Sequence, residues 1–235
     1  MRVVVMRFAD RADAGRRLAE SLRFLAGQDV VVVGLPRGGV PVAFEVARAL
    51  GAPLDVIVVR KLGVPVQPEL GMGAVGEGGV RIVDREIVRR AGVSERELST
   101  VEQRERVEVA RRASRLRGDK TPVPLTGRTV IVVDDGMATG STARAACQVA
   151  RAQGATRVVL AVPVGPEDTE RRMRADADEI ICLYKPVDFV AVGQFYDSFD
   201  QTIDREVVEL LRRASERAAA VSAANDPVDP VCDKE

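Results

Sequence analysis

Two adjacent aspartates followed by a turn of small residues form the segment of this chain best suited to chemistry. The apolar run before Asp134 and Asp135 is typical of a buried parallel strand. Where a turn of small residues begins a helix, backbone N–H groups and hydroxyls can bind a phosphate. The two carboxylates would accept hydrogen bonds from sugar hydroxyls. This pattern predicts a sugar-phosphate site, and the turn consists of Ala138, Thr139, Gly140, Ser141 and Thr142.

An acidic pair at the end of a strand can also serve a different metal or phosphate ligand, as in many doubly wound folds. Two further segments bear on that alternative. Arg37, Gly38 and Gly39 follow the apolar run 30–35, and Arg60 and Lys61 follow the run 56–59. Glycines let the backbone approach phosphate oxygens, and an arginine offers a planar fork suited to diphosphate. Each segment alone could equally be a glycine-capped turn or a solvated strand end.

Together the segments resemble the signature of the type I phosphoribosyltransferases, which bind 5-phosphoribosyl-1-diphosphate (PRPP). The resemblance covers roughly residues 28–200 and rests on VIVVDDGMATGST, PRGG and RKLG. Within this superfamily, FADRADAG, QPELGMGAVGEGG and VGQFYDSFDQ resemble an incompletely characterised bacterial branch of predicted phosphoribosyltransferases. The resemblance implies an α/β fold, with a doubly wound, mostly parallel sheet flanked by helices and a small hood.

The resemblance also implies a role for each segment. The turn 138–142 would bind the 5-phosphate, and Arg37, Gly38 and Gly39 would bind the diphosphate. The implied catalytic residues are Asp134, Asp135, Arg60 and Lys61, with the acids fixing the ribose and favouring a cationic transition state. Mg²⁺ is the implied cofactor, bridging ribose hydroxyls and diphosphate oxygens. Its implied ligands are Asp134, Asp135 and Asp197.

The segment 185–199 would form the hood that selects the acceptor, which the resemblance implies to be a nucleobase. Five of the eight phenylalanines and tyrosines of the chain lie between residues 184 and 199. Phe189 could stack on a base, as an aromatic does in purine-using relatives, or these rings could simply pack the hood against the sheet. Hypoxanthine–guanine enzymes carry an aspartate where this chain has Ala138. That departure weakens an oxopurine assignment.

Composition excludes several classes of chemistry. The chain has no histidine, which removes imidazole bases, histidine-containing triads and histidine-bound zinc. Equal numbers of acidic and basic residues, 35 each, predict no binding to nucleic acid or to a membrane. Three well-separated cysteines without metal-site spacing, together with the absence of a recognisable secretion signal, predict free thiols and a cytoplasmic protein.

Apolar strands that alternate with helical patterns predict a single domain over residues 1–224, with a core at about 28–183. We expect a mobile loop or loose hairpin at 62–83, a hood at 184–200 and a disordered tail at 225–235. Within the loop, Gly71–Gly76 matches the dinucleotide pattern GxGxxG but lacks the flanking strand and helix. We expect Glu69 and Glu77 to be solvated.

Ser94 and Glu97 predict a capped, highly charged helix to about Arg117. The pairs Glu102–Arg106 and Glu108–Arg112 have the i,i+4 spacing of surface salt bridges. A solvated surface is the default interpretation of this helix, and a partner-binding surface is the alternative.

Three functions remain open from the sequence. The leading one is a Mg²⁺-dependent phosphoribosyltransferase that transfers the phosphoribosyl group of PRPP to a small nitrogenous acceptor. The second is a regulator that senses PRPP or a nucleotide and has little turnover. The third is another reaction of a ribose phosphate, such as hydrolysis or phosphorolysis. A homodimer is implied by the resemblance alone.

Overall fold

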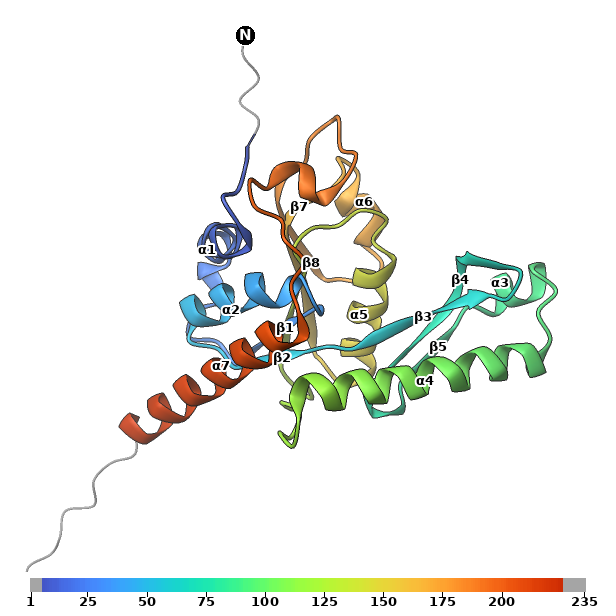
Figure 1. Cartoon of the computed structure of the whole chain (residues 1–235), viewed down its shortest axis with the longest axis horizontal. Coiled ribbons are helices and arrows are strands. Elements are labelled where there is room, and N and C mark those ends of the chain that lie inside the picture. Colours follow the sequence, from blue (N-terminus) through green and yellow to red (C-terminus); the bar gives the residue numbers. More distant parts are fainter. Residues whose placement is uncertain (1–5, 226–235) are drawn as a thin grey trace, which may run out of the picture.

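The computed structural model describes residues 6–225 and is built around a five-stranded sheet (Figure 1). The strand order is β2-β1-β6-β7-β8, and every neighbouring pair is parallel. Because both faces are covered, the central strands are almost continuously apolar, as the sequence predicts. The strands are β1 Val30–Gly34, β2 Leu54–Val56, β6 Thr129–Val133, β7 Arg157–Val164 and β8 Glu179–Tyr184.

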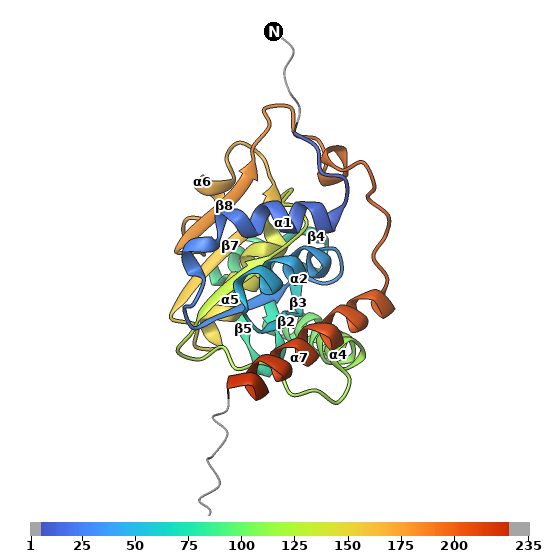
Figure 2. The same ribbon diagram turned by 90° about the vertical axis from the view of Figure 1, so that its left-hand side faces the viewer.

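Helices pack on both faces of this sheet, which confirms the doubly wound α/β class. The side chains of Val32 and Ile131 pack on one face with α1, α2 and α7, whereas those of Val31 and Val130 pack on the other with α5 and α6. Figure 2 shows α1 and α2 crossing the first face. The bounds are α1 Arg11–Ser21, α2 Gly39–Leu50, α5 Ser141–Ala152, α6 Thr169–Met173 and α7 Asp204–Asn225.

Residues 59–117 form an arm that projects from the core (Figure 1). The sequence left open whether residues 62–83 form a mobile loop or a loose hairpin, and the structure shows a hairpin within a three-stranded antiparallel sheet. The mobility of this segment stays a prediction. The GxGxxG segment lies within this antiparallel sheet and therefore lacks the strand–turn–helix context that a dinucleotide site needs. The arm consists of β3 Val59–Val64, β4 Gln67–Gly76, β5 Arg81–Val83, α3 Arg85–Arg90 and α4 Glu95–Arg117.

The long helix α4 begins as predicted and is anchored at its far end. Ser94 and Glu97 form the expected capping box. Leu98 and Val109 pack into the apolar core beneath the arm, so one face of the helix is not solvated. Its last residue, Arg117, inserts between the arm and the central sheet.

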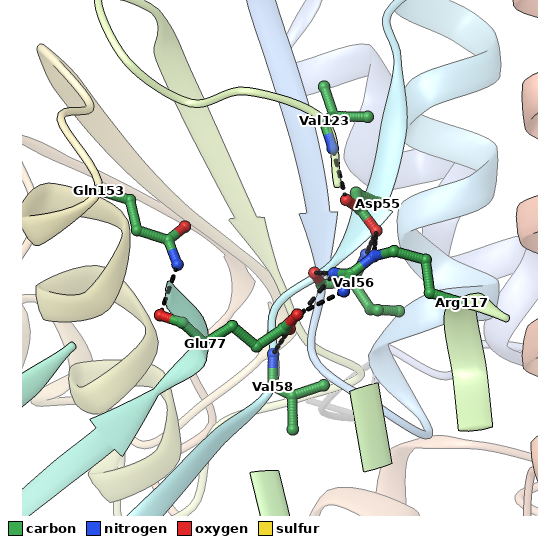
Figure 3. Close-up of polar contacts among 7 residues, drawn as sticks. All are labelled: Asp55, Val56, Val58, Glu77, Arg117, Val123 and Gln153. Atoms are coloured by element: carbon green, nitrogen blue, oxygen red, sulfur yellow. Dashed lines mark hydrogen bonds and ion pairs between the residues drawn. The ribbon is translucent and has the colours of Figure 1, made fainter. Parts of the chain in front are cut away.

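Arg117 joins two carboxylates that come from different parts of the fold (Figure 3). Its guanidinium donates to Asp55 Oδ1 at 2.8 Å, to both Glu77 oxygens and to the Val56 carbonyl oxygen at 2.9 Å. Glu77 also accepts from the Val58 N–H at 3.1 Å. The expectation that Glu77 is solvated was wrong, because Arg117 and the Val58 N–H bind its carboxylate. Glu69 is exposed, as expected.

The hood, residues 184–200, is mostly irregular and pairs with the start of the chain. The Phe8 N–H donates to the Phe195 carbonyl oxygen at 2.8 Å, and the Asp197 N–H donates to the Phe8 carbonyl oxygen at 2.9 Å. Phe8, Phe195 and Tyr196 are buried together. Aromatic packing therefore accounts for much of the clustering seen in the sequence.

No helix within residues 6–225 has the length and apolar character needed to cross a membrane. Of the predicted disordered tail, only Asn225, the last residue of α7, falls within the described residues.

Candidate functional site

The candidate site lies where β1 and β6 end side by side. Gly34 of β1 is paired with Val133 of β6, so the chain leaves both strands at the same edge of the sheet. Turns at the carboxyl edge of a parallel sheet commonly form ligand sites. The PRGG turn follows β1, and the aspartate pair follows β6. The sheet topology thus brings two of the predicted motifs together.

The two glycines of the PRGG turn pack directly against the aspartates. A Cβ on Gly39 would lie 2.6 Å from the Val133 carbonyl oxygen and 2.8 Å from Asp134 Cα. A Cβ on Gly38 would overlap Asp135 Oδ2. The Pro36–Arg37 peptide bond is cis. Only glycine allows the two backbones to approach this closely.

Both carboxylates of the pair are half-buried. Burial raises the pKa of Asp134 well above its ordinary value, and the charge of Asp135 raises it further. Burial also raises the pKa of Asp135, but a hydrogen bond from Arg11 opposes that effect. The Asp135 N–H donates to Asp134 Oδ1 at 2.9 Å. A neighbouring cation therefore favours the ionised forms of both groups.

Arg11, at the start of α1, is a site residue that sequence reasoning missed. Its Nε lies 2.8 Å from Asp135 Oδ2, and its Nη1 donates to the Asp200 carbonyl oxygen at 2.7 Å. The guanidinium carbon lies 3.9 Å from the centre of the Phe199 ring. Tyr196 donates to the Asp135 carbonyl oxygen at 2.6 Å. These contacts attach the hood to the acid pair. The only sequence signal for Arg11 as a site residue was its position within the segment FADRADAG.

The small-residue turn leads into α5 as predicted. Gly140 has a left-handed backbone conformation, with φ of 78°, and precedes the first helical residue, Ser141. The N-cap residue, Gly140, has no side chain to cap the helix, and only the Ser141 N–H has a side-chain acceptor among the described residues, Thr139 Oγ1 at 3.4 Å. The hydroxyls of Thr139 and Ser141 are 3.1 Å apart, and both residues are exposed with Thr142. Helix N–H groups and hydroxyls are therefore available to an anion.

A cleft of about 330 Å³ joins this turn to the basic segment of β3. Thr142, Arg60 and Lys61 line it together with Pro36 of the PRGG turn. Arg60 Nε lies 2.8 Å from Glu105 Oε2, and Lys61 Nζ lies 3.6 Å from Glu69 Oε2. Three of the four predicted motif segments therefore share one cleft.

Arg37 lies near this cleft and Arg112 lines it. The Nη1 atom of Arg37 is 3.6 Å from Asp204 Oδ1. Arg112 was expected to pair with Glu108, but Glu108 pairs with Arg111 instead. Arg112 donates to the Pro36 carbonyl oxygen at 3.3 Å. The predicted Glu102–Arg106 pair does form, with an Nε to Oε1 distance of 2.9 Å.

Two predicted hood residues are placed apart from this arrangement. Asp197 is exposed and pairs with Arg7 at 3.1 Å. Within residues 6–225, no group of three or more cysteines or acids is placed to hold a metal ion, and the role of Asp197 as a metal ligand stays a prediction. Phe189 stacks on Phe195, with ring centres 5.8 Å apart and planes at 15°. Its contact with a base stays a prediction.

Comparison with known proteins matches residues 7–199 to the phosphoribosyl transferase domain family. A Mycobacterium tuberculosis protein, named provisionally as a phosphoribosyl transferase, is 56% identical over 231 residues. That alignment covers 97% of this chain and 52% of the relative, so the chain spans about half the length of such relatives.

Two other relatives are similar to this chain. The crystal structure of TT1426 from Thermus thermophilus is 44% identical, with a TM-score of 0.82. The match covers 88% of this chain and 99% of TT1426. The bifunctional protein PyrR of Chloroflexus aurantiacus is 30% identical over 143 residues, which is 60% of this chain and 72% of that protein.

Proposed function

Because this chain belongs to the phosphoribosyl transferase domain family, we propose that it transfers the 5-phosphoribosyl group of PRPP to a small nitrogenous acceptor and releases diphosphate. The observation that carries the proposal is the packing of Gly38 and Gly39 against the aspartate pair, beside the cleft lined by Arg60 and Lys61. The carboxylates that would bind the ribose hydroxyls and the N–H groups and cations that would bind the diphosphate would then lie at one edge of the sheet. A nucleobase is the acceptor class we propose.

Each part of PRPP has a candidate partner. The turn 138–142 offers N–H groups and hydroxyls to the 5-phosphate. Asp134 and Asp135 would accept hydrogen bonds from the ribose hydroxyls. Arg37 and the backbone of Gly38 and Gly39 would bind the diphosphate.

Cleavage at C1 develops positive charge on the ribose ring and negative charge on the leaving diphosphate. The carboxylates of Asp134 and Asp135 favour the cationic ring. Arg37, Arg60 and Lys61 stabilise the departing anion. Since Arg60 and Lys61 pair with Glu105 and Glu69, diphosphate would share or replace those carboxylate contacts.

Mg²⁺ fits this site through the acid pair. Burial raises the pKa of both Asp134 and Asp135, and the charge of Asp135 adds to the shift at Asp134, so a second cation beside them would favour the ionised forms. Mg²⁺ commonly takes one or two carboxylates and fills its shell with water and substrate phosphates. When bound with PRPP, it would offset charge on the diphosphate.

Calorimetric titration of PRPP with Mg²⁺ into the purified protein, followed by diphosphate release across a nucleobase panel, tests the proposal. Release that depends on a base would establish a transferase and identify its acceptor class. Binding without release for any base would favour the sensing regulator. No binding would reject PRPP as the ligand.

The matched variants are Asp134→Asn with Asp135→Asn, and Asp119→Asn, which changes an exposed acid after α4. We expect the double variant to lose at least about a hundredfold in turnover, because it removes charge from the transition-state site. Asp119→Asn should behave as the wild type. Wild-type turnover in a folded double variant would discard the assignment of these acids.

We also propose a homodimer, on the basis of the family resemblance. Light scattering of the purified protein should give twice the mass of one chain. A monomeric mass at micromolar concentration would reject this part of the proposal.

A further inference from the structure

Within residues 6–225, most arginines in the second half of α4 are paired with acids, but Arg112 is not. Among the six arginines from Arg104 to Arg117, five form ion pairs within the described residues. Arg112 instead donates to a neutral acceptor, the Pro36 carbonyl oxygen, at 3.3 Å. Its guanidinium lines the cleft that also contains Arg60 and Lys61.

The surroundings of Arg112 are unfavourable for a cation. Burial lowers its pKa, and the charges of Arg37 and Arg60 lower it further. The acids that act in the opposite direction, Asp204 and Glu108, are already paired with other arginines. Among the described residues this half-buried guanidinium has no acid paired with it, and an anion in the cleft would supply a counterion.

The position of Arg112 is also fixed by the fold. Five residues further along α4, Arg117 bonds to Asp55, Glu77 and the Val56 carbonyl oxygen (Figure 3). The same network holds the Val58 N–H through Glu77. Val58 lines the cleft. One cluster of hydrogen bonds therefore fixes the position of α4 relative to the wall of the cleft.

We propose that Arg112 binds the diphosphate of PRPP, so that α4 supplies part of a site that the sequence motifs do not cover. This inference rests on the proposed function. The planar guanidinium can donate two parallel hydrogen bonds to phosphate oxygens. Diphosphate would be the common counterion of Arg60, Lys61 and Arg112, which explains why Arg112 faces other cations and not Glu108.

Calorimetry with two probes tests the inference: inorganic pyrophosphate with Mg²⁺, and ribose 5-phosphate. Arg112→Ala should weaken pyrophosphate binding roughly tenfold to a hundredfold, as expected for lost charge-assisted hydrogen bonds. Ribose 5-phosphate binding should stay within about twofold, because it lacks the diphosphate. The control is Arg111→Ala, which changes an exposed, paired arginine one residue earlier and should leave both affinities unchanged.

Unchanged pyrophosphate binding, an equal loss for both probes, or the same loss in Arg111→Ala would overturn the inference. So would a wild-type protein that does not bind pyrophosphate. If Arg112→Ala does not fold by circular dichroism, Arg112→Gln carries the same expectation.

Turnover of PRPP, measured in parallel, separates this inference from the proposed function. If the wild type turns over PRPP and Arg112→Ala binds pyrophosphate as tightly as the wild type, only the role of Arg112 is overturned. Arg112-dependent pyrophosphate binding without turnover under any base supports the role of Arg112 and rejects the transferase.

Discussion

Arg11 and Asp135 illustrate how single residues set the charge of the candidate site. Two neighbouring carboxylates are costly to ionise when half-buried, and the directions of both pKa shifts reflect this cost. Arg11 supplies one compensating charge and also bonds to the hood at Asp200. Neutralisation of the acid pair and attachment of the hood therefore depend on the same side chain.

Replacing Arg11 should destabilise the protein. Arg11→Ala leaves Asp135 without its cation and removes a hydrogen bond to Asp200, so we expect a loss of about 1–3 kcal/mol in the free energy of unfolding. Urea denaturation gives this value. Arg16→Ala, at an exposed position on the same helix, should cost less than about 1 kcal/mol. Equal effects of the two changes would contradict this role for Arg11.

Arg37 should discriminate between the two phosphate groups of PRPP. Arg37→Ala is expected to weaken pyrophosphate binding by about tenfold and to leave ribose 5-phosphate binding almost unchanged, because we propose that the guanidinium contacts only the diphosphate. Titration of both ligands checks this. The same loss for both would reject the assignment.

The glycine turn makes a sharper steric prediction. Gly39→Ala places a Cβ against the backbone of Val133 and Asp134, which cannot move without disturbing β6. We expect PRPP binding at least about tenfold weaker and a stability cost of about 1–3 kcal/mol.

Gly51, at the other end of α2, provides the control for that prediction. Gly51→Ala is strained by its φ of 66° but meets no atom within 4 Å. It should lower stability and leave PRPP affinity intact. If both variants retain wild-type affinity, close packing at Gly39 is not required for binding.

At the scale of elements, α4 differs most from its interpretation as a solvated helix. The predicted Glu102–Arg106 pair forms, but Glu108 pairs with Arg111. One face of the helix is buried, and its end is anchored in the core. Burial alone would lower the pKa of Arg117, but hydrogen bonds and charges from Glu77 and Asp55 outweigh burial and raise it. The arm and the central sheet are therefore held together by a well-compensated buried cation.

Removal of that cation should be costly. Arg117→Ala leaves the carboxylates of Asp55 and Glu77 without their cation, so we expect a loss of about 3–5 kcal/mol in unfolding free energy. Arg115→Ala breaks a more exposed pair with Asp204 and should cost less than about 1 kcal/mol. Chemical denaturation compares the two. Similar small losses would mean that the network contributes little to stability.

At the scale of the whole molecule, buried thiols link stability to pH. Burial raises the pKa of Cys147 from 9.0 to about 12 and that of Cys182 to about 11. Between pH 9 and these values the folded state retains protons that the unfolded state has lost. Stability should therefore decrease as pH rises above 9.

The contribution of Cys147 can be isolated by substitution. Between pH 8 and pH 10, the wild type should lose about 1.4 kcal/mol more than Cys147→Ala, which has no thiol to titrate. Urea denaturation at the two pH values measures this difference, and other titrating groups cancel in the comparison. Parallel losses would show that Cys147 is not protected by burial.

Much of the core was predictable because its signals are local. The apolar run 30–35 and the run before Asp134 predicted β1 and β6, and Ser94 with Glu97 correctly marked the start of α4. The run 56–59 was less informative, because β2 ends at Val56 and β3 begins at Val59 in a different sheet. The arm was harder to predict, because its glycine-rich strands are stabilised by packing on α4 and not by their own propensity. Helix α3 was also missed, being only six residues long.

The sequence by itself determined the doubly wound fold and the motifs that follow β1 and β6, because strand periodicity and turn chemistry depend on neighbouring residues. Only the tertiary structure decided the partners of the charged groups. Arg11 meets an aspartate 124 residues away, and Glu108 selects Arg111 over Arg112. Such choices depend on contacts between remote segments, since the local energies of alternative arginine pairings differ by only a few tenths of a kcal/mol.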